Sequence, residues 1–284
     1  MVEINWEKFN QDTTSIVLNN SEITVLNWVG APSDLEVINL SSNQIKELNW
    51  AGAPRGLKMI YLNCNQITEL NWVGAPPGLK SVNLYDNQIT ELNWVGAPPS
   101  MKCVDLDSNQ ITELNWVGSP PGLEEINLFC NLITKLNWVG APPGLAIVSL
   151  NENRISELNW VGIPQGLKYV FLNRNGITEM NWVGAPPGLE EIHLYGNRIT
   201  QLNWVGVPWN ILSFDIRSTG ISYKQYKAEH PFLDPSKPKR ALTEELTHFA
   251  LLPPGFSSVP VFKNGGRLFW ESYNEMASLG LIEN

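Results

Sequence analysis

Apolar positions along most of the chain return with a fixed spacing of 22 residues. Written from its first leucine-like position, the unit reads L-x-x-V-x-L-x-x-N-x-I-x-x-L-N-W-V-G-A-P-P-G, as in residues 79–100. Nine full units run from Thr13 to Asn210, and a tenth begins at Ile211. A period of this length is typical of proteins in which each unit stacks on its neighbours. The 284 residues therefore set the length of a stack rather than a number of globular domains.

The first part of each unit predicts a short strand. Val82 and Leu84 alternate with polar neighbours, and this period of two is typical of a strand with one buried face. So short a strand cannot bury that face alone. Stacking successive units in parallel, about 4.8 Å apart, completes both the backbone ladder and the core.

The second part of each unit predicts an extended return segment. Two prolines and two glycines in NWVGAPPG exclude a helix of several turns and favour an extended or polyproline-like path. Such a segment has little side-chain volume, so Trp72 and its equivalents are expected to fill the gap and to stack on one another. The alternative, an exposed ligand-stacking stripe, is less favoured because identical residues carry no partner-specific information.

An asparagine recurs at the ninth position of the unit. We expect its amide to turn inward and to satisfy backbone groups left unpaired where the strand ends. Ser21 and Thr219 replace it in the first and last units, where only one neighbour is present. The asparagines are Asn43, Asn65, Asn87, Asn109, Asn131, Asn153, Asn175 and Asn197.

The segment L-x-x-V-x-L-x-x-N-x-I resembles the signature of the leucine-rich repeat family over about three quarters of the chain. The resemblance implies a right-handed α/β-type solenoid, a horseshoe with short parallel strands on the concave face and extended Pro-rich segments on the convex face. The lead-in PPGL is similar to repeats of some bacterial effectors delivered into host cells, and comparable short repeats occur in large DNA viruses.

The repeat pattern also predicts boundaries. We expect an N-terminal cap at residues 1–12, the repeat solenoid at 13–222, a linker at 223–240 and a small C-terminal segment at 241–284. Lys237, Lys239 and Arg240 in this polar, Pro-containing linker are compatible with an anion or nucleic-acid contact, but the basic residues are few and acids lie nearby, which favours a solvated chain. Phe262 and Trp270 are too apolar for a solvated tail, so the last segment either caps the solenoid or docks onto a partner.

Three positions of each unit, the third, fifth and seventh, vary along the chain and are expected to point toward the concave face. Two groups of them have the exposed aromatics and charged rim typical of protein interfaces, although single surface aromatics are also common. The first cluster consists of Tyr169, Phe171, Arg174, Glu191, His193 and Tyr195. The second strip, which is more acidic, consists of Tyr61, Tyr85, Asp105, Asp107 and Phe129.

Charge and composition narrow the class of partner. The net charge is −9, and residues 1–222 hold 12 Lys and Arg against 21 Asp and Glu, which disfavours nucleic-acid binding. Neither a secretory signal nor an apolar run of about 18 residues is present, so we expect no membrane partner and a cytoplasmic location, or the host cytosol for an effector or viral protein.

Catalytic and cofactor motifs are absent from the sequence. It has three His and three Cys, with no CxxC, HExxH, Walker-type loop or GxSxG, so we expect no enzyme activity, metal or cofactor. His193 lies near Glu191 in sequence, but no nucleophile with an orienting third group accompanies them. Cys64 and Cys130 lie three units apart, about 14 Å, which is too far for a disulfide and favours a reducing compartment.

These observations predict a non-catalytic protein–protein interaction module that recognises a protein partner through the concave face. The alternative is a structural component of a larger assembly, such as a viral particle, that contacts neighbours through the convex face or the C-terminal segment. The sequence leaves the partner's identity and the oligomeric state open.

Overall fold

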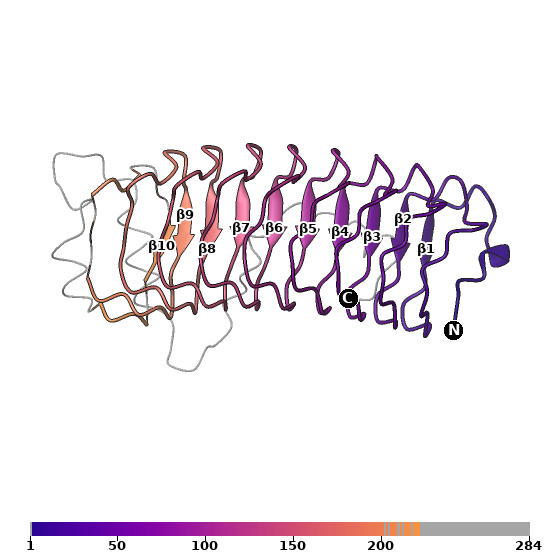
Figure 1. Cartoon of the computed structure of the whole chain (residues 1–284), viewed down its shortest axis with the longest axis horizontal. Helices are drawn as coiled ribbons and strands as arrows, with labels where there is room; N and C mark the ends of the chain where they lie inside the picture. The colour runs from indigo at the N-terminus through magenta and orange to yellow at the C-terminus, as the bar shows by residue number, and fades with distance from the viewer. Residues whose placement is uncertain are drawn as a thin grey trace.

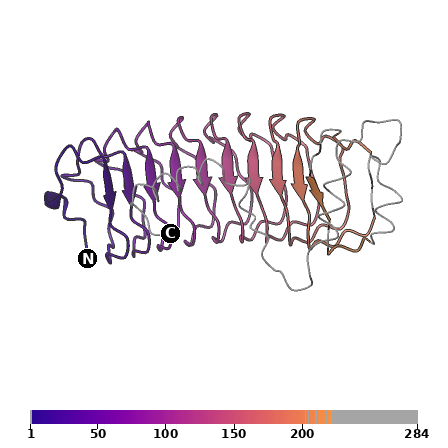
Figure 2. The same cartoon turned by 180° about the vertical axis from the view of Figure 1, so that it is seen from behind.

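The computed structural model describes residues 2–221, except residues 202, 204, 209, 210, 212 and 217, and for residues 213–215 it describes the backbone alone. This part of the chain is an elongated solenoid whose strands lie side by side along its long axis (Figures 1 and 2). Strands β1 to β10 form one parallel sheet in chain order. The strands are β1 (Ser15–Val17), β2 (Val37–Asn39), β3 (Met59–Tyr61), β4 (Ser81–Asn83), β5 (Cys103–Asp105), β6 (Glu125–Asn127), β7 (Ile147–Ser149), β8 (Tyr169–Phe171), β9 (Glu191–His193) and β10 (Ser213–Asp215).

The register of the sheet equals the period of the sequence. Val82 of β4 pairs with Val104 of β5, and every other pair of neighbouring strands has the same 22-residue offset. The ladder continues past each strand, because Leu84 N donates to Asp105 O (2.8 Å) and Asp86 N donates to Asp107 O (2.9 Å). The chain then bends away at the eighth position, where Asp86 has a φ of 54°. The sequence prediction of short parallel strands is confirmed.

The ninth-position asparagine closes this bend from inside the coil. The Asn87 Nδ2 donates to Leu62 O and Leu84 O, both at 3.0 Å, and its Oδ1 accepts from Ile67 N at 3.0 Å. One buried amide thus satisfies backbone groups of its own coil and the preceding one. The predicted inward role of this asparagine is confirmed.

The tryptophans form a buried column. From Trp28 to Trp182, the repeated tryptophan in each coil is 0–2% exposed. The Trp72 and Trp94 rings stack with centroids 6.5 Å apart and planes 2° apart. The rings from Trp6 to Trp160 also have a backbone partner that the sequence pattern did not reveal; Trp72 Nε1, for example, donates to Asn93 O at 2.7 Å. The predicted scaffold role of the tryptophans is confirmed, and the exposed-stripe alternative is wrong.

The return segments contain turns in place of helix. In one coil, Ala97 N donates to Trp94 O (2.9 Å), Gly96 has a φ of +83°, and Met101 N donates to Pro98 O (3.1 Å). Within the described residues the one helical element is the 3-10 turn η1 (Trp6–Lys8). The Trp6 ring stacks on Trp28 with centroids 5.8 Å apart, so it begins the buried column.

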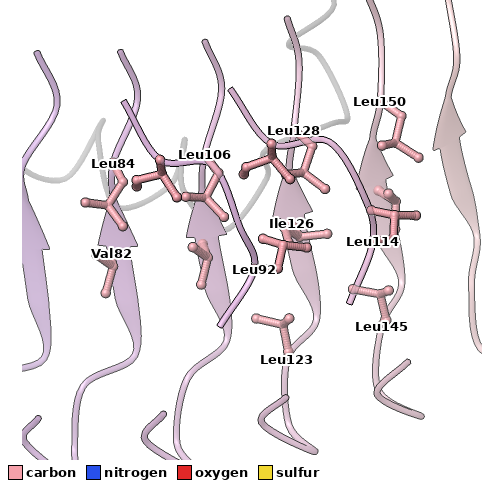
Figure 3. Packing of buried hydrophobic residues seen from close by; sticks show 14 of the residues in the cluster. Val82, Leu84, Leu92, Leu106, Leu114, Leu123, Ile126, Leu128, Leu145 and Leu150 are labelled. Carbon is pink, nitrogen blue, oxygen red and sulfur yellow. The ribbon is translucent and has the colours of Figure 1, made fainter. Parts of the chain in front are cut away.

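Leucines and isoleucines of successive coils fill the space between the sheet and the return segments. Figure 3 shows side chains such as Leu84, Leu106, Leu128 and Leu150 at equivalent places in consecutive coils. All four are fully buried, and the cluster they belong to extends from Ile4 to Ile216 without interruption. The core therefore runs along the whole described solenoid. The predicted linker at 223–240 and C-terminal segment at 241–284 lie outside the described residues.

Candidate functional site

The third, fifth and seventh positions lie along the sheet face that points away from the core, here called the concave face. Because the strands pair with an offset of one unit, residues at equal positions form columns across this face. Tyr169 is the register partner of Glu191, and Phe171 is the register partner of His193. The structure therefore brings together the six residues of the first cluster on β8, β9 and the turns that follow them.

The centre of the first cluster is an edge-on aromatic contact. Phe171 and His193 meet at a centroid distance of 5.0 Å with planes 83° apart. His193 Nε2 lies 3.5 Å from a carboxylate oxygen of Glu191 on the same strand. The hydroxyl of Tyr169 donates to Glu190 Oε2 at 2.8 Å. This carboxylate also pairs with Lys168, and the two contacts lower the pKa of Glu190.

Arg174 forms the edge of the first cluster. Its guanidinium carbon lies 5.9 Å from the centroid of the Tyr195 ring, and its Nη1 lies 2.6 Å from Glu152 Oε1. The Tyr195 backbone N–H donates to Asn173 Oδ1 at 2.8 Å. Arg174 is exposed, and Tyr195 is half-buried. A cation held over a ring and tied to a carboxylate occupies a defined position before any partner arrives.

Burial on the concave face differs from the sequence expectation. Phe171 is 2% exposed and Tyr61 is 4% exposed, so the prediction that these two aromatics are exposed is wrong. Residues of equal position lie only about 4.8 Å apart in a parallel sheet, and in-register neighbours cover the sides of a flat ring. Tyr169 and His193 are half-buried.

The two aspartates of the acidic strip are also buried, at 7% exposure for Asp105 and 8% for Asp107. Their carboxylates bind the backbone: Asp105 Oδ1 accepts from Asp107 N (3.1 Å), and Asp107 Oδ1 accepts from Phe129 N (2.7 Å). Asn83 does the same for Tyr85 N at 2.9 Å. The interpretation of these aspartates as exposed recognition residues is therefore wrong, because both are turned toward backbone donors that the ladder leaves unpaired.

Burial raises the pKa of these carboxyls. Desolvation raises the pKa of Asp105 to about 6, although the hydrogen bond from Asp107 N acts in the opposite direction and lowers this pKa. Desolvation, and then the charge of Asp105, raises the pKa of Asp107 well above its ordinary value. The pKa of the Cys103 thiol is raised by burial and then by Glu125. The centre of the concave face thus concentrates acidic groups in a region poor in water.

Glu125 belongs to this acidic centre and was missed by the sequence reasoning. It lies on β6, is 0% exposed and is the register partner of Cys103. Asn127 Nδ2 donates to its Oε1 at 3.3 Å. The sequence signal that could have indicated this residue is its position: Glu125 stands at the third position of the unit that follows Cys103 and Asp105, so it lies beside them in the sheet. The accessible residues of the strip are Tyr85, which is 41% exposed, and Phe129, which is half-buried.

The chain resembles known proteins in its structure but not detectably in its sequence: no family model and no curated protein matches the sequence. A leucine-rich repeat protein of Leptospira interrogans superposes with a TM-score of 0.65 and 26% identity, over 74% of this chain and 56% of that one. YopM of Yersinia enterocolitica gives 0.54 and 25%, over 69% of this chain and 40% of that one. The chain has the leucine-rich repeat fold.

The chain is also similar in fold to TLR13, solved in a complex with ssRNA13. The TM-score is 0.62 at 21% identity, over 71% of this chain and 32% of that one. The chain thus spans between about a third and just over half of each of these three similar structures.

Neither a metal site nor a membrane span was found in the described residues of the leucine-rich repeat protein. No group of three or more His, Cys, Asp or Glu side chains there is arranged to hold a metal ion. No helix in the same residues has the length and hydropathy needed to cross a membrane. Cys64, Cys103 and Cys130 are all free thiols.

Proposed function

We propose that this leucine-rich repeat protein is a non-catalytic recognition module that binds a protein partner through its concave face, chiefly through the first cluster. The observation that supports the proposal is the arrangement of Tyr169, His193 and Tyr195 around buried Phe171, with Arg174 at the edge. Tyrosine and arginine are enriched among the residues that dominate protein–protein affinity.

Preorganisation favours the same cluster. Glu152 and the Tyr195 ring hold the Arg174 side chain, and Glu190 holds the Tyr169 hydroxyl. Side chains already ordered in the free protein lose less conformational entropy on binding.

A nucleic-acid partner is disfavoured by the charge of the same face. TLR13 forms a complex with ssRNA13 on a similar fold. Here residues 1–222 hold 12 Lys and Arg against 21 Asp and Glu, and the whole chain carries a net charge of −9. Nucleic-acid affinity depends on neutralising phosphates with basic side chains, so this face favours a protein, and preferably one with a basic surface.

The ends of the solenoid and its compartment are part of the proposal. Residues 1–12 serve as the N-terminal cap, which is supported by Trp6 stacking on Trp28. Residues 241–284 serve as a C-terminal cap or as a docking segment. The three free thiols support a reducing compartment, which is the cytoplasm or the host cytosol of an effector or viral protein.

The test compares proteins captured by tagged variants in the native host cell, quantified by mass spectrometry. The test variant is Tyr195→Ala with Arg174→Ala. The matched control is Tyr85→Ala, which removes a tyrosine at the same seventh position five coils away, and a second control is Thr112→Ala on the outer surface. We expect a protein that is lost from the test variant and retained by both controls. Identical sets from all four proteins would contradict the assignment to the first cluster.

A structural component of a larger assembly is the second candidate function. It is favoured by one observation, a row of exposed valines on the outer surface of the coils. That function depends on a different surface, so the Tyr195 and Arg174 variant would leave it intact.

A further inference from the structure

Eight of the eleven large hydrophobic side chains that are exposed in the described solenoid are valines at the seventeenth position of the unit. These side chains are 65–78% exposed, although each directly follows a buried tryptophan. Because the coils stack in register, these valines form a line along the solenoid, here called the valine row, which is interrupted in the second coil by Ala51. The row consists of Val29, Val73, Val95, Val117, Val139, Val161, Val183 and Val205.

The local backbone does not require valine at this position. Val95 is the second residue of a turn in which Ala97 N donates to Trp94 O at 2.9 Å and Gly96 has a φ of +83°. This turn needs glycine at its third residue but accepts most residues at its second. Ala51 occupies the equivalent place in a turn with the same hydrogen bond, from Ala53 N to Trp50 O at 2.9 Å. The recurrence of an exposed valine therefore has no cause within the coil.

The sequence segment that carries the valine row is also almost free of charge. Across the nine full units, positions 14 to 22 contain only two charged residues, Asp34 and Arg55. In most units, such as the one that includes residues 136–144, these positions contain none. Charged side chains such as Glu91 and Glu113 lie at other positions of the same coils. The centres of protein interfaces are depleted of charge in this way. Because the chain carries a net charge of −9, two copies repel each other least where they meet through this uncharged segment.

We propose that the valine row is a self-association surface and that its occupant is a second copy of this chain. Identical side chains at a fixed spacing are best matched by a partner whose apolar side chains have the same spacing on an equally rigid backbone. A second copy has that spacing by construction, and a two-fold contact places one row against the other. Soluble proteins seldom leave so long an apolar line uncovered. This inference goes beyond the concave-face function and does not depend on it.

Sedimentation velocity over a range of protein concentrations tests the proposal. The test variant carries Val95→Asp, Val117→Asp and Val139→Asp. The control carries Thr90→Asp, Thr112→Asp and Thr134→Asp, which adds the same charge to the same three coils at exposed positions outside the uncharged segment. We expect wild type and control to dimerise with Kd on the order of micromolar, and the valine variant to raise Kd at least about a hundredfold.

Three outcomes would overturn the proposal: a wild type that stays monomeric at about 100 µM, a dimer that persists in the valine variant, or equal dissociation of both variants. Thermal melting at low concentration verifies that each variant is folded. Partner capture by the valine variant is measured in parallel. Loss of self-association with retained capture separates this surface from the concave face, and failure of either assay leaves the other result intact.

Discussion

The tryptophan column and the concave face belong to the same coils but differ in how they use sequence. The column has one residue type from Trp28 to Trp182, each 0–2% exposed and hydrogen-bonded to backbone in most coils. The concave columns change residue type at almost every step, from Tyr61 through Asp105 to Phe171. Every coil closes around the same interior volume, so the interior repeats. The outer side of the strand has no such requirement, so it varies.

Variation nevertheless does not mean exposure. Phe171 and Asp105 lie at variable positions and are buried, whereas Val117 lies at a repeated position and is 74% exposed. Repetition in this protein has two causes, closure of the coil and, as we propose, pairing with a second copy. Four predictions break or sharpen this comparison, from the largest expected effect to the smallest.

Removing one tryptophan should have the largest effect. Trp116→Ala is expected to lower the free energy of unfolding by roughly 3–5 kcal/mol, because it leaves a cavity and removes stacking on Trp138 at 6.3 Å. It also leaves Asn137 O without its 2.7 Å donor. Urea unfolding gives the value, and Val117→Ser, next in the chain but exposed, should change it by less than about 0.5 kcal/mol. Equal effects of the two substitutions would refute the distinction between column and surface.

Replacing a ninth-position asparagine should have the second-largest effect on stability. Asn109→Leu replaces a buried polar amide by an apolar side chain of similar size. It leaves Ile89 N without its 3.0 Å acceptor and removes one of the two amide donors of Leu84 O and of Leu106 O, which keep Asn87 and Asn131. We expect a loss of about 2–3 kcal/mol in unfolding free energy. Gln110→Leu, at the adjacent exposed position, is the control and should be nearly neutral. A stability unchanged in Asn109→Leu would show that the turn closes without the amide.

Asp105→Asn should stabilise the protein at neutral pH. Its pKa is raised from 3.8 to about 6 in the folded state, so folding favours the protonated form. The associated stability is present below pH 3.8 and is lost as the pH rises through about 6. Asparagine also accepts the Asp107 N–H, as Asn83 accepts Tyr85 N. We expect a gain of about 1–2 kcal/mol at pH 7.5 that disappears below pH 4, measured by urea unfolding at both values. A loss at pH 7.5 would contradict the burial of an ionised carboxylate.

The smallest effect is expected for Tyr85→Ala on the concave face. Tyr85 is 41% exposed, so its removal should change unfolding free energy by less than about 1 kcal/mol. The same urea assay checks this value against Trp116→Ala. A loss comparable to that of Trp116→Ala would mean that the concave face is part of the core along its whole width.

The sequence by itself determined the architecture of this protein. The 22-residue spacing predicted the parallel register, and the prolines and glycines excluded a helix of several turns from the return segments. The inward roles of Asn87 and Trp72 followed from the volume and polarity that a coil must enclose. These features depend on contacts between equivalent residues of adjacent units, and a periodic sequence specifies such contacts directly.

Tertiary structure alone decided which variable side chains are accessible. The burial of Phe171, Tyr61 and Asp107, the membership of Glu125 in the acidic centre and the exposure of Val117 depend on the neighbours that stand within a few ångströms in three dimensions. The alternation of apolar and polar residues along a strand predicts on which face of the sheet a side chain lies. The side chains of the neighbouring strands decide how exposed it is to water. The sequence therefore predicted which side chains lie together on one face of the sheet, and packing between coils decided how buried each of them is.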